Sequence, residues 1–359
     1  MKEIKIGNLT MRIPIIQGGM GVGVSLGNLA GHVALEGGMG VISTAHPGYR
    51  KKNFARNALQ ANKEALKEEI EKAKKIACGK GIVAINAMVA ITDYAALVEH
   101  AVASGVDAII SGAGLPLQLP KFVKNNVKIA PIVSSGKAIH LILQTWHRKY
   151  KKTADFIVIE GSEAGGHLGF KKADILSQAT QKLPEILSDV LERIKPFEKE
   201  YNQRIPVFVA GGIFTGSDIR KYLQLGASGV QMATRFIATH ECDANIKFKE
   251  ALLKSKENDI QLVGSPVGLP GRAVMTPLTR TLEKGERVPV KKCYDCLIPC
   301  NPSTTQYCIS GALIEAVKGN LTEGLVFSGS NGYRLDRLRS VKELIHELME
   351  ECALEECMV

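Results

Sequence analysis

Short apolar runs alternate along the chain with longer amphipathic stretches. Eight of these runs, most of four to seven residues, are rich in Val, Ile and Ala, and several show no polar alternation. A strand without polar alternation buries both faces, which is typical of a parallel sheet covered by helices. We therefore predict eight strands, at residues 13–17, 39–43, 82–88, 107–111, 128–134, 156–160, 206–210 and 229–233.

Eight units of a strand followed by a helix are what a (β/α)8 TIM barrel requires, and a doubly wound sheet is the competing architecture. We assign the barrel to residues 1–258. Residues 259–359 are expected to form a C-terminal, mainly helical extension packed on the barrel. This extension begins with a turn-rich segment at 264–272, and residues 341–348 have helical periodicity.

Small residues follow several of the predicted strands. Glycines cluster at 18–23, 112–114 and 211–212, after the first, fourth and seventh strands. In a barrel these loops all lie at the C-terminal face, where active sites are assembled from the ends of several strands. The longer segment 44–60 after the second strand is expected to lie over the same mouth as a lid.

Charge and composition narrow the function classes. The formal net charge is +10, but the charges are scattered, and one Trp with 5% aromatic residues offers few rings for base stacking. We therefore expect no nucleic-acid partner. No apolar run reaches 18 residues and the amino terminus lacks the apolar stretch of a signal peptide, so we expect no membrane association and a cytoplasmic location.

The segment 157–169 carries the clearest candidate for catalysis. A β-branched run ends in a glycine-rich loop whose single imidazole belongs to His167. Small residues let a flat or anionic ligand approach the backbone closely, so we predict that His167 acts on a bound molecule. A glycine-rich turn that merely carries a surface histidine is the structural alternative.

The turns after the seventh and eighth strands share a second pattern. Gly211, Gly212 and the small Ala233 leave backbone N–H groups uncovered at two adjacent helix starts, which favours a phosphate site. Tight turns alone would also account for the glycines. Lys137 follows the fifth strand, and Asn86 places an amide within the apolar third strand, where it needs hydrogen-bond partners.

These motifs resemble those of the nitronate monooxygenase (2-nitropropane dioxygenase) family, and they are similar to those of the FMN-dependent enoyl-acyl-carrier-protein reductase II enzymes. The resemblance covers roughly residues 10–255, and Glu-Ala-Gly-Gly-His at 163–167 is its most specific element. It implies an FMN cofactor, with the catalytic His167 beside the flavin ring. The cofactor-binding residues that it implies are Gly19, Met20, Asn86, Lys137, Glu160, Gly166, Gly211, Gly212, Ala233 and Thr234.

Two activities follow from the resemblance. The first is nitronate monooxygenase activity, in which alkyl nitronates or nitroalkanes are oxidised with O2. The alternative is NAD(P)H-dependent reduction of an enoyl thioester, with an acyl-carrier protein as partner. Both classes share the motifs, act on small molecules and are compatible with a homodimer. An IMP-dehydrogenase-like barrel would need a nucleophilic cysteine after the sixth strand, where this chain has His167.

Four cysteines are grouped within sixteen residues near the C-terminal end. Cys293, Cys296, Cys300 and Cys308 follow the spacing C-x2-C-x3-C-x7-C, which permits an iron–sulfur cluster or a zinc ion. Unligated structural thiols are the remaining interpretation, and the spacing leaves all three open.

Overall fold

The computed structural model describes residues 3–124 and 126–354, and its centre is a closed barrel of eight parallel strands. All eight predicted strands are present, each within two residues of its predicted bounds, and the closed order excludes the doubly wound sheet. The barrel strands, in spatial order, are β3 (Ile15–Gln17), β4 (Met39–Ser43), β5 (Ile82–Met88), β6 (Ala108–Gly112), β7 (Lys128–Val133), β8 (Ile157–Glu160), β10 (Val207–Ala210) and β11 (Gly229–Met232).

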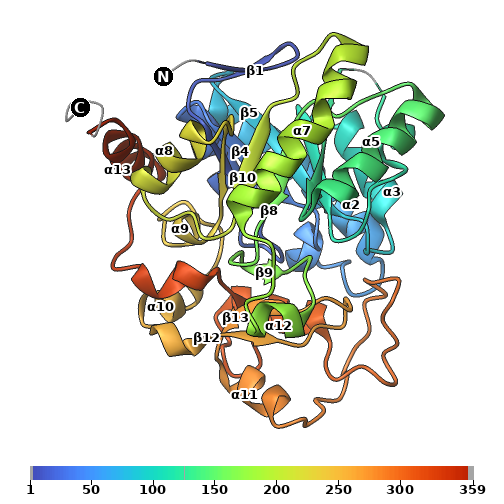
Figure 1. Cartoon of the computed structure of the whole chain (residues 1–359). Coiled ribbons are helices and arrows are strands. Elements are labelled where there is room, and N and C mark those ends of the chain that lie inside the picture. Colours follow the sequence, from blue (N-terminus) through green and yellow to red (C-terminus); the bar gives the residue numbers. More distant parts are fainter. Residues whose placement is uncertain (1–2, 125, 355–359) are drawn as a thin grey trace.

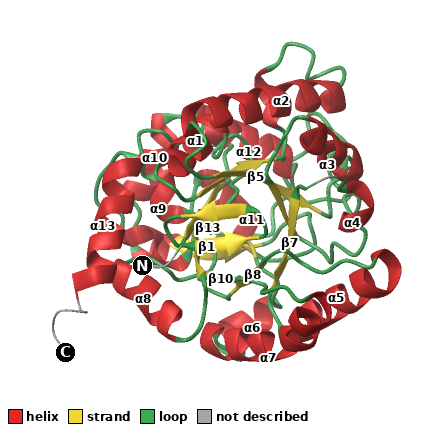
Figure 2. Ribbon diagram, turned by 90° about the horizontal axis from the view of Figure 1, so that it is seen from above, coloured by secondary structure: helices red, strands yellow, loops and turns green. Residues whose placement is uncertain are grey.

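Helices surround this barrel as an outer layer (Figure 2). Side chains that accept backbone hydrogen bonds fix several helix starts, as Asn57 does for α2 and Ser135 for α5. The helices between the barrel strands and just after them are α1 (Gly27–Leu35), α2 (Ala58–Ala77), α3 (Tyr94–Ala103), α4 (Leu119–Phe122), α5 (Gly136–Tyr150), α6 (Lys172–Leu176), α7 (Leu183–Tyr201), α8 (Gly216–Gln224), α9 (Thr234–Ile237) and α10 (Ile246–Leu253), with the 3-10 turn η1 at Pro47–Arg50.

The two ends of the barrel are closed differently. The hairpin of β1 (Ile4–Ile6) and β2 (Leu9–Met11) covers one end, and its fully buried Ile6 and Met11 join the apolar cluster that fills the barrel interior. Figure 1 shows this hairpin at one end and the C-terminal extension at the opposite end. The inward layers are thus packed, and the main cavity lies at the end that faces the extension.

The extension contains helices, as expected, and also a small sheet that the sequence did not predict. Strand β13 (Gly271–Val274) pairs antiparallel with β12 (Ile260–Val263), with β14 (Val326–Phe327) and with β9 (Gly166–His167), which belongs to the loop after β8. The extension is therefore joined to the barrel by backbone pairing. Its other elements are η2 (Glu257–Asp259), α11 (Pro277–Glu283), α12 (Ile309–Lys318) and η3 (Ser330–Arg334).

The last helix returns to the barrel. Helix α13 (Val341–Leu354) packs against α8, α1 and α9, and it lies in the outer layer in Figure 2. Segments on both sides of residue 258 thus contribute to that layer, and the division at 258 stays a prediction from the sequence. Within the part of the chain that the structure describes, no helix is both long and apolar enough to cross a membrane.

Candidate active site at the barrel mouth

A cavity of about 750 Å³ opens at the C-terminal ends of the barrel strands, a size typical of a cofactor or substrate pocket. Ten of the eleven residues predicted for catalysis or cofactor binding line it. They are Gly19, Met20, Asn86, Glu160, Gly166, His167, Gly211, Gly212, Ala233 and Thr234. Because these residues come from five different strand ends, only the closed barrel brings them together.

Lys137 is the exception among the predicted residues. It lies in the first turn of α5 with its side chain exposed, while Ser134, Ser135 and Ala138 around it contribute to the cavity lining. The strand end is thus at the cavity as predicted. The lysine itself is not among the lining residues, because one step along a helix turns a side chain away by about 100°.

Glycines at two places let the backbone lie close to the cavity or to neighbouring side chains. A Cβ atom at Gly19 would overlap the side chain of Asn86, so only glycine fits between β3 and β5 at this point. Gly211 and Gly212 adopt φ angles of +94° and +79°, a region that disfavours every residue with a side chain. The turn after β10 therefore requires both of its glycines.

This turn is held by the extension as well as by the barrel. The Asn331 side-chain amide donates a 2.8 Å hydrogen bond to the Gly212 carbonyl, and the Gly329 N–H donates a 3.0 Å bond to Thr234 Oγ1. Ser330 N–H also donates to the carbonyl of Glu163. The turns that follow β10 and β11 are thus held against residues 329–331.

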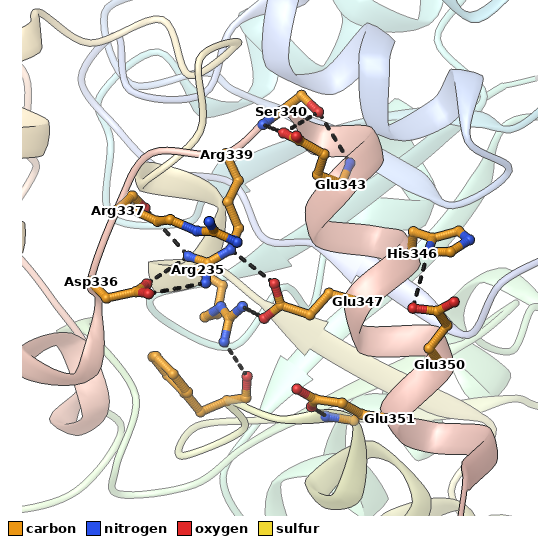
Figure 3. Close-up of polar contacts among 12 residues, drawn as sticks. Arg235, Asp336, Arg337, Arg339, Ser340, Glu343, His346, Glu347, Glu350 and Glu351 are labelled. Atoms are coloured by element: carbon orange, nitrogen blue, oxygen red, sulfur yellow. Dashed lines mark hydrogen bonds and ion pairs between the residues drawn. The ribbon is translucent and has the colours of Figure 1, made fainter.

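The turn after β11 is fixed from the side by a buried arginine. Arg235, the second residue of α9, is 7% exposed; it forms a 2.7 Å ion pair with Glu347 of α13 and donates to the Phe214 carbonyl (Figure 3). Arg339 contacts the other oxygen of Glu347 at 2.9 Å. The C-terminal helix therefore sets the position of the turn that carries Thr234.

Glu160 ends β8 at the cavity wall. Protein atoms surround its carboxyl although it is partly accessible from the cavity, and this burial raises its pKa from the ordinary 4.5 to about 8. At neutral pH the carboxyl is therefore largely protonated, so it can donate a hydrogen bond into the pocket.

His167 lies in β9, opposite Gly271 of β13. Its Nε2 is 2.7 Å from Ser265 Oγ, and its ring packs edge-on against Phe327 at 5.1 Å between centroids. Burial lowers the pKa of His167 to about 4, so the imidazole is neutral at pH 7 and has one nitrogen able to accept a proton. The residue is half-buried and braced on two sides, not a surface histidine on a free loop.

A polar atom in the cavity wall lacks a partner within the described protein. Gln231 of β11 lines the cavity, and its side-chain Oε1 is buried without a hydrogen bond. A buried unsatisfied carbonyl costs about 1–3 kcal/mol unless a ligand donates to it. The cavity is therefore better suited to a ligand with N–H donors than to a purely apolar one.

Sequence reasoning missed the contribution of the extension to this site. Arg272 of β13 donates 2.7 Å bonds to the carbonyls of Ser162 and Ala164, and so shapes the loop before His167. No local motif marks these positions, since they reach the cavity through long-range strand pairing. The extension residues in the cavity lining are Leu269, Leu313, Phe327, Ser328, Gly329, Ser330 and Asn331.

The segment 44–60, expected as a lid, is largely packed in place. Ala45 lines the main cavity, whereas His46 Nε2 lies 2.9 Å from Ser310 Oγ of α12. Phe54 stacks on Tyr294 of the extension at 5.3 Å. These contacts hold the segment against the extension beside the mouth.

The four clustered cysteines surround a second, smaller cavity of about 100 Å³. Cys293 is exposed and the other three are half-buried, and none forms a disulfide. Across the described residues, no three His, Cys, Asp or Glu side chains form a group that could hold a metal ion. The contacts among the described residues thus show neither the predicted iron–sulfur cluster nor the predicted zinc ion.

The chain is similar to several known proteins. A probable nitronate monooxygenase of Staphylococcus saprophyticus is 27% identical over 257 residues, which cover 71% of this chain and 65% of that protein. The chain therefore spans slightly less than two thirds of this relative.

Solved structures share the fold. FabK from Thermotoga maritima matches with a TM-score of 0.72 and 24% identity, over 97% of this chain and 96% of that one. The nitroalkane oxidase from Streptomyces ansochromogenes matches with a TM-score of 0.71 and 19% identity, over 97% and 98%. At these identities the likeness concerns the fold alone. The family model of nitronate monooxygenase matches residues 2–351, and the chain therefore belongs to the nitronate monooxygenase family, a family of oxidoreductase enzymes.

Proposed function

We propose that the 750 Å³ cavity binds FMN, with its phosphate at the turns that follow β10 and β11. The residues fit this group. Gly211 and Gly212, in the turn after β10, and Thr234, at the start of α9, offer backbone N–H groups that can stabilise an anion. The unsatisfied Gln231 Oε1 and the largely protonated Glu160 supply a hydrogen-bond acceptor and a donor for a ring with N–H and carbonyl groups.

We further propose that the enzyme is a nitronate monooxygenase, which oxidises alkyl nitronates, or nitroalkanes, with O2. Bound FMN would supply the electron acceptor and the site that returns electrons to O2. The observation that carries the proposal is a neutral imidazole held at the same cavity as the phosphate cradle. A neutral His167 can take the α-proton of a nitroalkane, which an imidazolium cannot do.

The surroundings of His167 support this role. Its hydrogen bond to Ser265 and its contact with Phe327 fix the ring, so that little orientational freedom is lost when substrate binds. A preformed nitronate has already lost its proton. For that substrate His167 would orient the anion by donating a hydrogen bond from its protonated ring nitrogen.

The proposal is tested on protein expressed with riboflavin available. Denaturation should release about one FMN per chain, and the enzyme should consume O2 with ethylnitronate or propionate 3-nitronate. Absence of flavin would overturn the cofactor assignment. Flavin without nitronate turnover, combined with NAD(P)H-dependent reduction of an enoyl thioester, would establish the alternative reductase activity instead.

A further inference from the structure

The cysteine cavity combines four thiols with a loop that is pinned to the barrel. Residues 293–308 cross from the extension to the end of β5, where the Thr92 N–H donates to the Cys296 carbonyl and the Ile298 N–H donates to the Ala90 carbonyl. Arg287 donates to the carbonyls of Pro302 and Thr305 and so braces the turn between Cys300 and Cys308. The loop has a defined path around the cavity without a disulfide.

The size of the cavity distinguishes between an ion and a cluster. A zinc ion bound at about 2.3 Å from each thiolate would bring the sulfur atoms to roughly 4 Å from one another. The described cysteines form no such group, yet all four line one cavity of about 100 Å³. Four cysteines lining one such cavity match the ligand number of an inorganic cluster whose four iron atoms each take one cysteine.

Backbone N–H groups favour an anionic occupant. The Asp295 N–H donates to Cys293 Sγ and the Gly311 N–H donates to Cys308 Sγ, both at 3.4 Å. Cys308 is also the N-cap of the ten-residue helix α12, whose positive end faces negative charge favourably. N–H donors to sulfur stabilise thiolate-bound clusters.

We propose that Cys293, Cys296, Cys300 and Cys308 bind a 4Fe–4S cluster. The site lies beside the main cavity. On α12, Ile309 lines the small cavity and Leu313 the large one, one helical turn or about 6 Å apart along the axis. Met88 at the end of β5 also lines the large cavity, two residues before Ala90. This inference does not rest on the proposed function, since iron and sulfide are measured whether or not flavin is bound.

The test is metal and sulfide analysis of the full chain, expressed and purified without oxygen. We expect about four iron and about four acid-labile sulfide per chain, with broad visible absorption beneath any flavin bands. Cys300→Ser should lose most of the iron and sulfide. Cys78→Ser is the matched control, because Cys78 is exposed and distant in sequence, and it should retain both.

Three results would overturn the proposal: one zinc per chain in place of iron, no iron after anaerobic reconstitution with ferrous iron and sulfide, or an unchanged iron content in Cys300→Ser. If Cys300→Ser is insoluble, Cys293→Ser replaces it, since Cys293 is exposed and its loss opens no buried cavity. Retention of the full iron content by that variant would contradict the ligand set in the same way.

Discussion

Two titratable side chains at the barrel mouth are neutral at pH 7, for the same physical reason. Burial lowers the pKa of His167 to about 4 and raises that of Glu160 to about 8, so the imidazole is unprotonated and the carboxyl is largely protonated. The cavity thus holds a potential proton acceptor and a potential proton donor without an ion pair. Such a pair suits a ring cofactor that needs both kinds of hydrogen bond.

Replacement of His167 tests its role in proton transfer. His167→Ala should lower turnover of a neutral nitroalkane by about 10²–10⁴-fold, the usual effect of losing a general base. The loss should be smaller with preformed nitronate, and bound flavin should be retained. Steady-state kinetics on both substrates and flavin release measure this. Ser265→Ala is the control, since it removes the 2.7 Å bond but keeps the imidazole. Equal losses on the two substrates would contradict the role as a base.

The shifted pKa of Glu160 predicts a pH-dependent stability. The unfolded chain releases this proton near pH 4.5 and the folded protein near pH 8, so the carboxyl lowers the free energy of unfolding progressively as the pH rises between those values. Flavin-free Glu160→Gln should therefore gain melting temperature relative to the unmodified protein from about pH 5 to about pH 8. A difference that stays constant across this range would show that Glu160 titrates normally.

At the level of elements, helix α13 fixes a turn that lies about a hundred residues earlier in the sequence. Its Glu347 holds Arg235, which directly follows Thr234 in the turn proposed for the phosphate (Figure 3). Arg235 also lies 4.5 Å from the centroid of the Phe214 ring, and Phe214 lines the cavity. Loss of the ion pair would thus affect the cavity in two ways, through Thr234 and through Phe214.

Glu347→Gln tests this connection. Removing the charge partner of a buried arginine should lower the free energy of unfolding by about 1–3 kcal/mol and weaken FMN binding, because Arg235 no longer fixes α9. Thermal unfolding and flavin titration measure the two effects. Glu350→Gln breaks an exposed pair with His346 on the same helix and should change neither. If Glu347→Gln left the FMN affinity unaltered, α13 would have no role in FMN binding.

The glycine turn after β10 allows a second matched comparison. Gly212 and Gly105 have the same φ of +79°, so Gly212→Ala and Gly105→Ala should both lose about 1–2 kcal/mol of stability. Only Gly212 lines the cavity, and a Cβ there would also meet the Glu163 carboxyl. FMN affinity should fall about tenfold or more, an effect of about 1.4 kcal/mol, in Gly212→Ala alone. Equal affinities in the two variants would place the phosphate elsewhere.

For the molecule as a whole, the barrel could be predicted from the sequence, whereas the extension could be predicted only in part. Continuous apolar runs are a local signal of strands buried on both faces, and the barrel then brings Asn86, His167 and Gly212 to one mouth by topology. The pairing of His167 with Gly271 and the contact of Asn331 with Gly212 have no local signal, because they join segments about a hundred residues apart. Lys137 lies outside the cavity lining for a different reason, since a strand-end position does not determine which way a helical side chain points.

The central claim is that this chain uses a bound flavin to oxidise nitronates, and anaerobic reduction of that flavin tests it most directly. Without O2, ethylnitronate or propionate 3-nitronate should bleach the flavin absorption rapidly, while NADH and NADPH should bleach it slowly or not at all. Because O2 is absent, this comparison measures reduction of the flavin without its reoxidation. Rapid bleaching by NADH with none by either nitronate would contradict the account.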